Sequence, residues 1–103
     1  MVRHDFTALD AHYPSIIAQM PETFTSHQFI LQLARQHQRL YVEALYAYRD
    51  VTHRGAAAPF MAVHNILATH LIKHPDLIEL LRHNVSSTNI FGESSECTQW
   101  KRR

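Results

Sequence analysis

The feature that most constrains this chain is the stretch from residue 22 to residue 54, which contains neither glycine nor proline. Within it, apolar residues recur with the 3.6-residue period of an α-helix. They are Phe29, Ile30, Leu33, Ala34, Leu40, Tyr41, Ala44, Leu45 and Tyr48. The period predicts a long amphipathic helix with one buried stripe, although the polar run 35–39 leaves open a corner between two helices.

The start of this helix carries two capping signals. Thr25 and Gln28 have the spacing of a capping box, in which each side chain bonds the backbone N–H of the other residue. Phe24 and Phe29 occupy the two positions of a hydrophobic staple, which fixes the chain as it enters a helix. We therefore expect the helix to begin at Ser26.

A second helix is expected over residues 59–73. Pro59 suits the first helical position, because the N–H that proline lacks would have no partner there. The turn before it contains Gly55, the one glycine that precedes the tail. The buried stripe of this helix is expected to be Phe60, Val63, Leu67 and Leu71.

The last third of the chain carries weaker signals. Pro75 should end the second helix. Asp76 and Glu79 then lie where acids favour a helix N-terminus, which predicts another helix over 76–83. Beyond Asn84 the composition changes to Ser, Thr, Asn and Gly, which predicts an irregular tail or a short hairpin.

Together these elements predict one compact all-α domain over residues 1–103. A chain of this length with 46% hydrophobic residues can bury a core without a disulfide or a metal. We expect residues 1–24 to form an N-terminal lid, with about two helical turns between Pro14 and Pro21. Residues 25–84 should form the helical core, and residues 85–103 the irregular or short-hairpin tail.

Charge and cysteine content limit the classes of partner. The net charge is +1, so no overall field favours nucleic acid, a membrane surface or an acidic substrate. The single cysteine, Cys97, cannot form an internal disulfide. No apolar run has the length of a membrane span, and no leader segment is recognisable. These observations predict a cytoplasmic protein with no membrane partner.

Nine histidines invite a metal hypothesis. His70 and His74 have the i, i+4 spacing that lets two imidazoles on one helix meet one ion. A zinc site needs further ligands, but His64 projects from another part of the helix, and the sequence holds no cysteine pair and no His-Glu-x-x-His motif. Packed or surface histidines are the better interpretation, so we expect no metal and no cofactor.

The sequence also lacks a pattern typical of an enzyme. Cys97, Ser94 and Ser95 lie in a polar tail without a nucleophile elbow, a triad pattern or a phosphate-binding glycine loop. Glu93 and Glu96 are more often two solvated acids than a catalytic pair. We expect no enzymatic activity.

One face of the second helix suggests nucleic-acid recognition. Ala62, Asn65, Thr69 and Lys73 line the side opposite the apolar stripe. In a major groove, Asn pairs with adenine, methyl groups contact thymine and Lys reaches phosphate. The basic end of the chain, Lys101, Arg102 and Arg103, would add phosphate contacts. The alternative interpretation is an ordinary solvated helix face.

The order of elements, two helices joined by a turn and followed by a turn-rich tail, resembles a helix-turn-helix or winged-helix layout. The segments Phe24–Ile30, Val63–His64 and Asn89–Trp100 are similar to those of small bacterial proteins of unassigned function with such cores. The resemblance implies this fold but no particular role. With the polar helix face, it favours a small DNA-binding or transcription-associated domain, with double-stranded DNA as the partner.

A second functional hypothesis is a non-enzymatic protein-interaction module. Leu31, Val42 and Tyr46 lie off the main apolar stripe, so this helix is expected to contact neighbours on more than one side. The partner would be another protein or a second copy of the chain in a homodimer.

Overall fold

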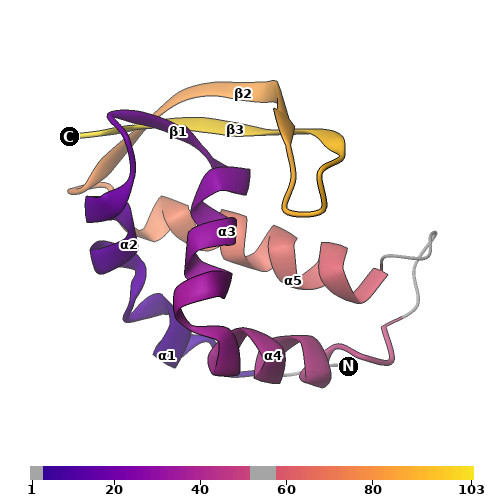
Figure 1. Ribbon diagram of the computed structural model, residues 1–103. Helices are drawn as coiled ribbons and strands as arrows, with labels where there is room; N and C mark the ends of the chain where they lie inside the picture. The colour runs from indigo at the N-terminus through magenta and orange to yellow at the C-terminus, as the bar shows by residue number, and fades with distance from the viewer. Residues whose placement is uncertain (1–3, 52–57) are drawn as a thin grey trace.

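The computed structural model describes residues 4–51 and 58–103. In these residues five α-helices and one 3-10 helix lie on one side of a three-stranded antiparallel sheet (Figure 1). The helices are α1 (Thr7–Asp10), α2 (Tyr13–Gln19), α3 (Ser26–Gln36), α4 (Gln38–Ala47), α5 (Ala58–Thr69) and the 3-10 helix η1 (His70–Lys73). The strands are β1 (Thr23–Thr25), β2 (Ile78–Thr88) and β3 (Ser94–Arg102).

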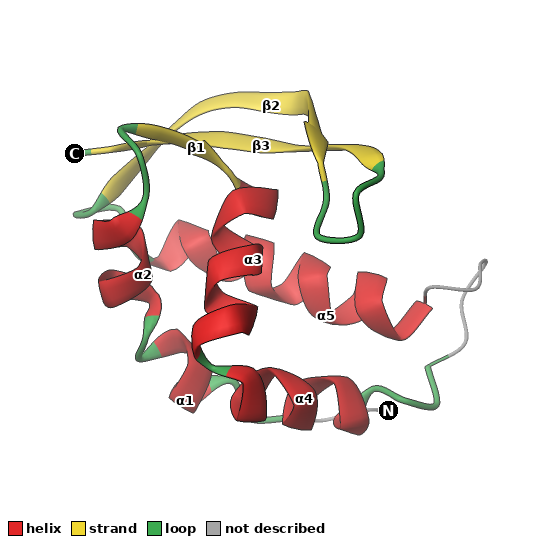
Figure 2. Ribbon diagram, in the orientation of Figure 1, coloured by secondary structure: helices red, strands yellow, loops and turns green. Residues whose placement is uncertain are grey.

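The expectation of an all-α domain is wrong for the last third of the chain, and the domain is mixed α/β (Figure 2). A helix was expected over 76–83, but β2 begins at Ile78 and pairs with β3. Short apolar runs such as residues 77–81 fit a helix face or a strand equally well, so periodicity cannot separate the two. The pairing with β3 makes this segment a strand, because it supplies backbone hydrogen bonds from a distant part of the chain.

The tail is a hairpin, which is one of the two expected alternatives. The turn between β2 and β3 is held by Asn89, whose side-chain oxygen accepts hydrogen bonds from the backbone N–H groups of Phe91 (2.9 Å) and Glu93 (3.1 Å). Gly92 has a φ of +82°, a value that residues with a side chain rarely adopt. The Asn and Gly that suggested a loop therefore form a tight turn between two paired strands.

The predicted helix start is confirmed. Thr25 Oγ1 accepts a hydrogen bond from the Gln28 N–H (3.2 Å), and Gln28 Oε1 accepts one from the Thr25 N–H (2.8 Å), which completes the capping box. The rings of Phe24 and Phe29 lie 6.5 Å apart, as the staple requires. The helix α3 begins at Ser26, directly after the last residue of β1.

Residues 26–47 form two helices. Of the two possibilities left open by the sequence, one long helix or a corner between two helices, the second is correct. The break is one residue long: His37 has φ −131° and ψ 54°, and its ring stacks on His12 at 3.7 Å. Because only one residue leaves the helical path, the apolar period continues almost unchanged across the corner. The sequence period therefore could not reveal where α3 ends and α4 begins.

The core is one cluster that joins all the helices to the sheet. Its centre is α5, with Val63 and Leu67 fully buried, continued by Leu71 of η1. The predicted second helix, 59–73, thus agrees with α5 and η1 together, whereas the turn around Gly55 lies outside the described residues. The hydroxyl of Tyr13 donates a hydrogen bond to the backbone carbonyl of Leu67 (2.6 Å), which ties α2 to α5.

Truncation of either of two fully buried leucines should destabilise this core. Leu33→Ala and Leu67→Ala should each lower the free energy of unfolding by about 2–5 kcal/mol, through lost burial and the cavity left behind. Met61→Ala, on the exposed face of α5, is the control and should change it by less than about 0.5 kcal/mol. Urea and thermal unfolding measure the effect, and parent-like unfolding of both leucine variants would contradict the packing of α3 and α5.

Candidate functional site

A groove runs between α5 with η1 on one side and the β2–β3 hairpin on the other. It holds two hollows, of about 420 Å³ and about 510 Å³, which share Ala68, Thr69 and Thr98. We call the first the hairpin hollow and the second the apolar hollow. From the rise of an α-helix and of a 3-10 helix, the wall formed by α5 and η1 is about 26 Å long. The groove is therefore long enough for a peptide segment.

The apolar hollow has a buried hydrophobic floor and exposed hydrophobic sides. Its floor includes Leu71, Ile78 and Trp100, which are buried. On its sides, Ile72 of η1 is 66% exposed and Leu80 of β2 is 46% exposed. Large apolar side chains on both sides of a hollow are typical of a binding surface.

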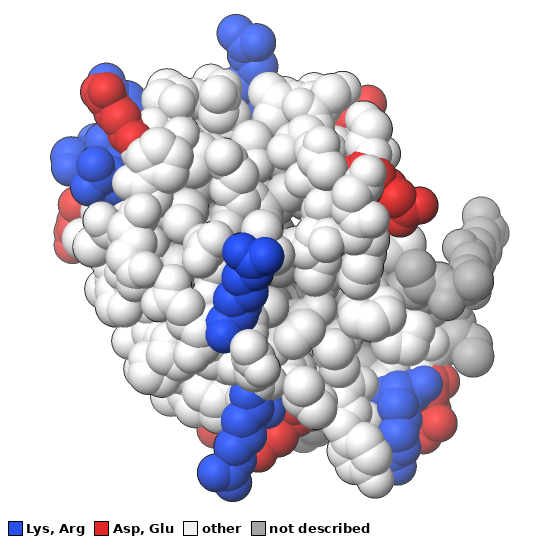
Figure 3. Space-filling model, viewed as in Figure 1, with Lys and Arg blue, Asp and Glu red and all other residues white. Residues whose placement is uncertain are grey.

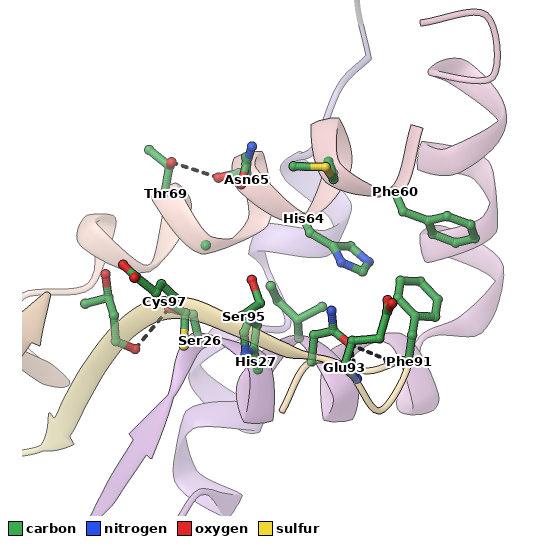
Figure 4. Close-up of a pocket in the computed structure, with 16 residues that line it drawn as sticks. Ser26, His27, Phe60, His64, Asn65, Thr69, Phe91, Glu93, Ser95 and Cys97 are labelled. Carbon is green, nitrogen blue, oxygen red and sulfur yellow. Dashed lines mark hydrogen bonds between the residues drawn. The ribbon is translucent and has the colours of Figure 1, made fainter. Parts of the chain in front are cut away.

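The hairpin hollow is lined by aromatic rings and acids (Figure 4). The rings of Phe60 and Phe91 lie 4.8 Å apart, edge to face, and His64 stacks on Phe91 at 5.9 Å. Glu93 and Glu96 line the hairpin side. Among the described residues that line this hollow there is neither Lys nor Arg. The hollow thus joins aromatic rings with negative charge.

His64 points into the hairpin hollow (Figure 4), and its ring is hydrogen-bonded to Tyr41 of α4. Its Nε2 lies 2.6 Å from the Tyr41 hydroxyl. Burial, with a smaller contribution from nearby His27, lowers the pKa of His64 to about 4, and burial raises the pKa of Tyr41 to about 12. Both side chains are neutral at pH 7. Since a phenol donates more readily than it accepts, we infer that Tyr41 donates to Nε2 and that the proton of His64 is on Nδ1.

His27, from the first turn of α3, also lines the hairpin hollow. Its Nδ1 is buried and has no hydrogen-bond partner in the part of the chain that the structure describes. Burial lowers the pKa of His27, while the Ser87 backbone acts in the opposite direction. A buried polar atom without a partner is uncommon in native proteins.

The predicted DNA-reading residues of α5 are only partly brought together. Asn65 and Thr69 are exposed at the edge of the hairpin hollow (Figure 4). Ala62 is half-buried. The Thr69 hydroxyl donates to the backbone carbonyl of Asn65 (2.8 Å). Lys73 lies beyond the helix, with its amine 3.5 Å from a carboxylate oxygen of Asp10. One member of the predicted line is thus already paired with an acid.

The three basic residues at the chain end lie at the opposite end of the sheet from the hairpin turn. Lys101 pairs across the sheet with Thr23 and with Glu79, and the Arg102 N–H donates to the backbone of Glu22 (2.8 Å). Arg103 donates to the backbone of Pro75 (2.6 Å) and lies 3.7 Å from Glu79.

On the face seen in Figure 3, charged side chains form scattered and mostly mixed groups. This face therefore carries no continuous basic surface.

The predicted histidine pair is separated by the end of α5. His70 begins the 3-10 helix, so the i, i+4 spacing to His74 no longer places both rings on one α-helical face. His70 Nδ1 lies 2.8 Å from Asp10 Oδ1, and His74 stacks on Tyr13. Across residues 4–51 and 58–103, no three His, Cys, Asp or Glu side chains are grouped to hold a metal ion.

The residues proposed for protein interaction fall on two surfaces. Val42 and Tyr46 are exposed one turn apart on α4. Leu31 is half-buried and lines a separate small hollow with Met20 and Gln28. Sequence reasoning missed the groove itself, because its walls come from segments far apart in the chain. Phe91, a large aromatic residue in a mostly polar tail, is a local signal that could have indicated it.

No helix in the described residues is both long and apolar enough to cross a membrane. Comparisons with known protein families, with curated proteins and with solved structures each found no match.

His64 should make stability depend on pH. Its pKa falls from 6.5 in the unfolded chain to about 4 in the fold, so between these values the unfolded chain binds more protons. The contribution of neutral His64 to the free energy of unfolding is therefore fully present above about pH 6.5. It is lost as the pH falls toward 4. His64→Gln should flatten this part of the pH dependence of the free energy of unfolding, measured by urea titration.

His83→Gln, at an exposed position of β2, is the matched control and should leave the slope as in the parent protein. An unchanged slope in His64→Gln would show that this imidazole is not buried in its neutral form.

Proposed function

We propose that this domain is a non-enzymatic protein-interaction module that binds a segment of a partner protein in the groove between α5 and the hairpin. The observation that carries the proposal is the pair of exposed apolar side chains, Ile72 and Leu80, above a buried hydrophobic floor. A peptide that covers them would remove their apolar surface from water, which favours association. Recognition in grooves by apolar anchors is a recurring mode of peptide binding.

The low charge of the chain supports the same proposal. Charged residues make up 18% of the sequence, against about 25% in typical soluble domains. Interface cores are depleted in charge and enriched in aromatic residues and Met. Phe60, Met61 and Phe91 are exposed along the groove and have this chemistry.

The partner is expected to bind through side chains rather than by adding a long strand to the sheet. β2 is an edge strand, because the strand order is β1-β3-β2 in the described residues. Its register shifts between Leu80 and Arg82 and again between Arg82 and Val85, and Asn84 has a φ of +55°. Irregularities of this kind twist an edge strand and discourage edge-to-edge pairing.

DNA binding, the first functional hypothesis, has less support from the geometry. Glu93 and Glu96 lie beside the hairpin turn, opposite the line of Asn65 and Thr69, and would repel phosphates. No Lys or Arg occurs between residues 83 and 100. The order of helices and hairpin still favours this hypothesis, so duplex DNA is included as an alternative partner in the test.

Selection of peptides from a displayed random library, with the immobilised domain as target, tests the proposal. The selected peptides should share apolar anchor residues and should bind with a Kd that fluorescence anisotropy can measure. Ile72→Ser and Leu80→Ser should each weaken binding by about tenfold or more, which corresponds to about 1.4 kcal/mol. Val42→Ser and Tyr46→Ser, at exposed positions on α4, are matched controls and should bind as the parent does.

Three outcomes would overturn the proposal. The first is a library that yields no shared sequence. The second is binding that is lost in the α4 variants but kept in the groove variants, which would place the interface on α4. The third is salt-dependent binding to random duplex DNA at low ionic strength together with no peptide binding, which would favour the DNA hypothesis.

A further inference from the structure

We propose that the hairpin hollow binds a basic side chain, an arginine, of the same partner segment whose apolar anchor occupies the apolar hollow. This inference rests on the proposed function and adds the chemistry of the partner. Glu93 and Glu96 are the charged residues that line the hollow, and the described lining residues include no Lys or Arg. Among the described lining residues, a cation entering this end of the groove therefore meets only negative charge.

The aromatic rings provide a second, independent reason for a cation. Phe91 is 47% exposed and packs edge to face on Phe60, so part of each ring remains open to the hollow. A guanidinium or ammonium group is attracted to the face of such a ring, and arginine makes this contact more often than lysine. His64, stacked on Phe91, is neutral at pH 7 because of its low pKa, so it does not repel a cation.

The shape of the guanidinium group is a third reason, and it points to arginine. A guanidinium carries five N–H donors in a planar fork, so it can pair with the carboxylate of Glu93 or Glu96 while its planar face lies on the Phe91 ring. A lysine ammonium has fewer donors and no planar face to stack on Phe91.

The two hollows also predict the spacing of the partner's anchors. From His64 to Ile72 the wall extends by eight residues, or roughly 13 Å at the rise of α-helical and 3-10 turns. An extended peptide covers this distance in about four residues. The bound segment should therefore carry its arginine about four positions from its apolar anchor.

Titration with a small cation tests the hairpin hollow without any partner. Butylguanidinium, followed by amide chemical shifts in heteronuclear NMR, should perturb residues of the hollow such as Ser95 and Cys97. Butyramide, which is neutral and of similar length, should bind at least about fivefold more weakly. The double variant Glu93→Gln, Glu96→Gln should abolish this preference, and Phe91→Leu, which keeps an apolar group but removes the ring, should weaken it.

Equal binding of both probes to the parent, or a preference that survives in the double Gln variant, would overturn the inference. Leu80→Ser is the matched control, because it alters the apolar hollow alone and should leave butylguanidinium binding unchanged. Loss of butylguanidinium binding in Leu80→Ser would show that the cation does not occupy the hairpin hollow, and would equally overturn it.

The selected peptides separate failure of this inference from failure of the proposed function. The proposed function and the arginine inference are both supported if the peptides share an apolar anchor and an arginine about four positions away. The arginine preference must also be lost in the double Gln variant. Peptides that depend on Ile72 and Leu80 but carry no basic preference retain the proposed function and overturn the inference. If no peptide is selected, the proposed function fails. The butylguanidinium titration still tests whether the hairpin hollow prefers a cation to a neutral molecule.

Discussion

The arrangement of this domain depends on the pairing of Phe24 with Trp100 across β1 and β3. Both side chains are buried, and the Trp100 indole N–H donates a hydrogen bond to the Ser26 hydroxyl (3.1 Å) at the first residue of α3. The same short segment thus caps a helix and anchors the C-terminal strand. Because β3 is held here, it becomes the central strand, and β2 can pair only on its other side.

The groove is a consequence of this pairing. With β3 fixed over α3, the hairpin extends past the end of β1 and lies along α5 (Figure 1). The floor below it is filled by Leu71, Ile78 and Trp100, but η1 and the irregular part of β2 leave Ile72 and Leu80 unpacked. Because β1 is only three residues long and its residues do not line the groove, β2 and β3 alone supply the strands on its sheet side.

Local features were predictable from the sequence, and features that need distant partners were not. The capping box of Thr25 and Gln28 involves neighbouring residues, so its spacing alone defined the start of α3. The strand pairing of Ile78 with Arg102 leaves no trace in a local window, and acids near Pro75 suggested a helix instead. The site depends on the same distant contacts, since His27, His64 and Phe91 meet only after the hairpin has folded back onto α5.

The charges along the groove would influence the orientation of the bound partner segment more than its affinity. Near the apolar hollow, Lys73 is paired with Asp10 and Arg103 with Glu79, so this end holds little free charge. At the hairpin end, Glu93 and Glu96 have no basic neighbour among the described lining residues. Charges at the rim of an interface mainly set association rate and register, whereas buried apolar anchors set most of the affinity. A partner bound in the reverse direction would place its cation against apolar walls and leave the two acids unpaired, and this difference in free energy would select one direction of binding.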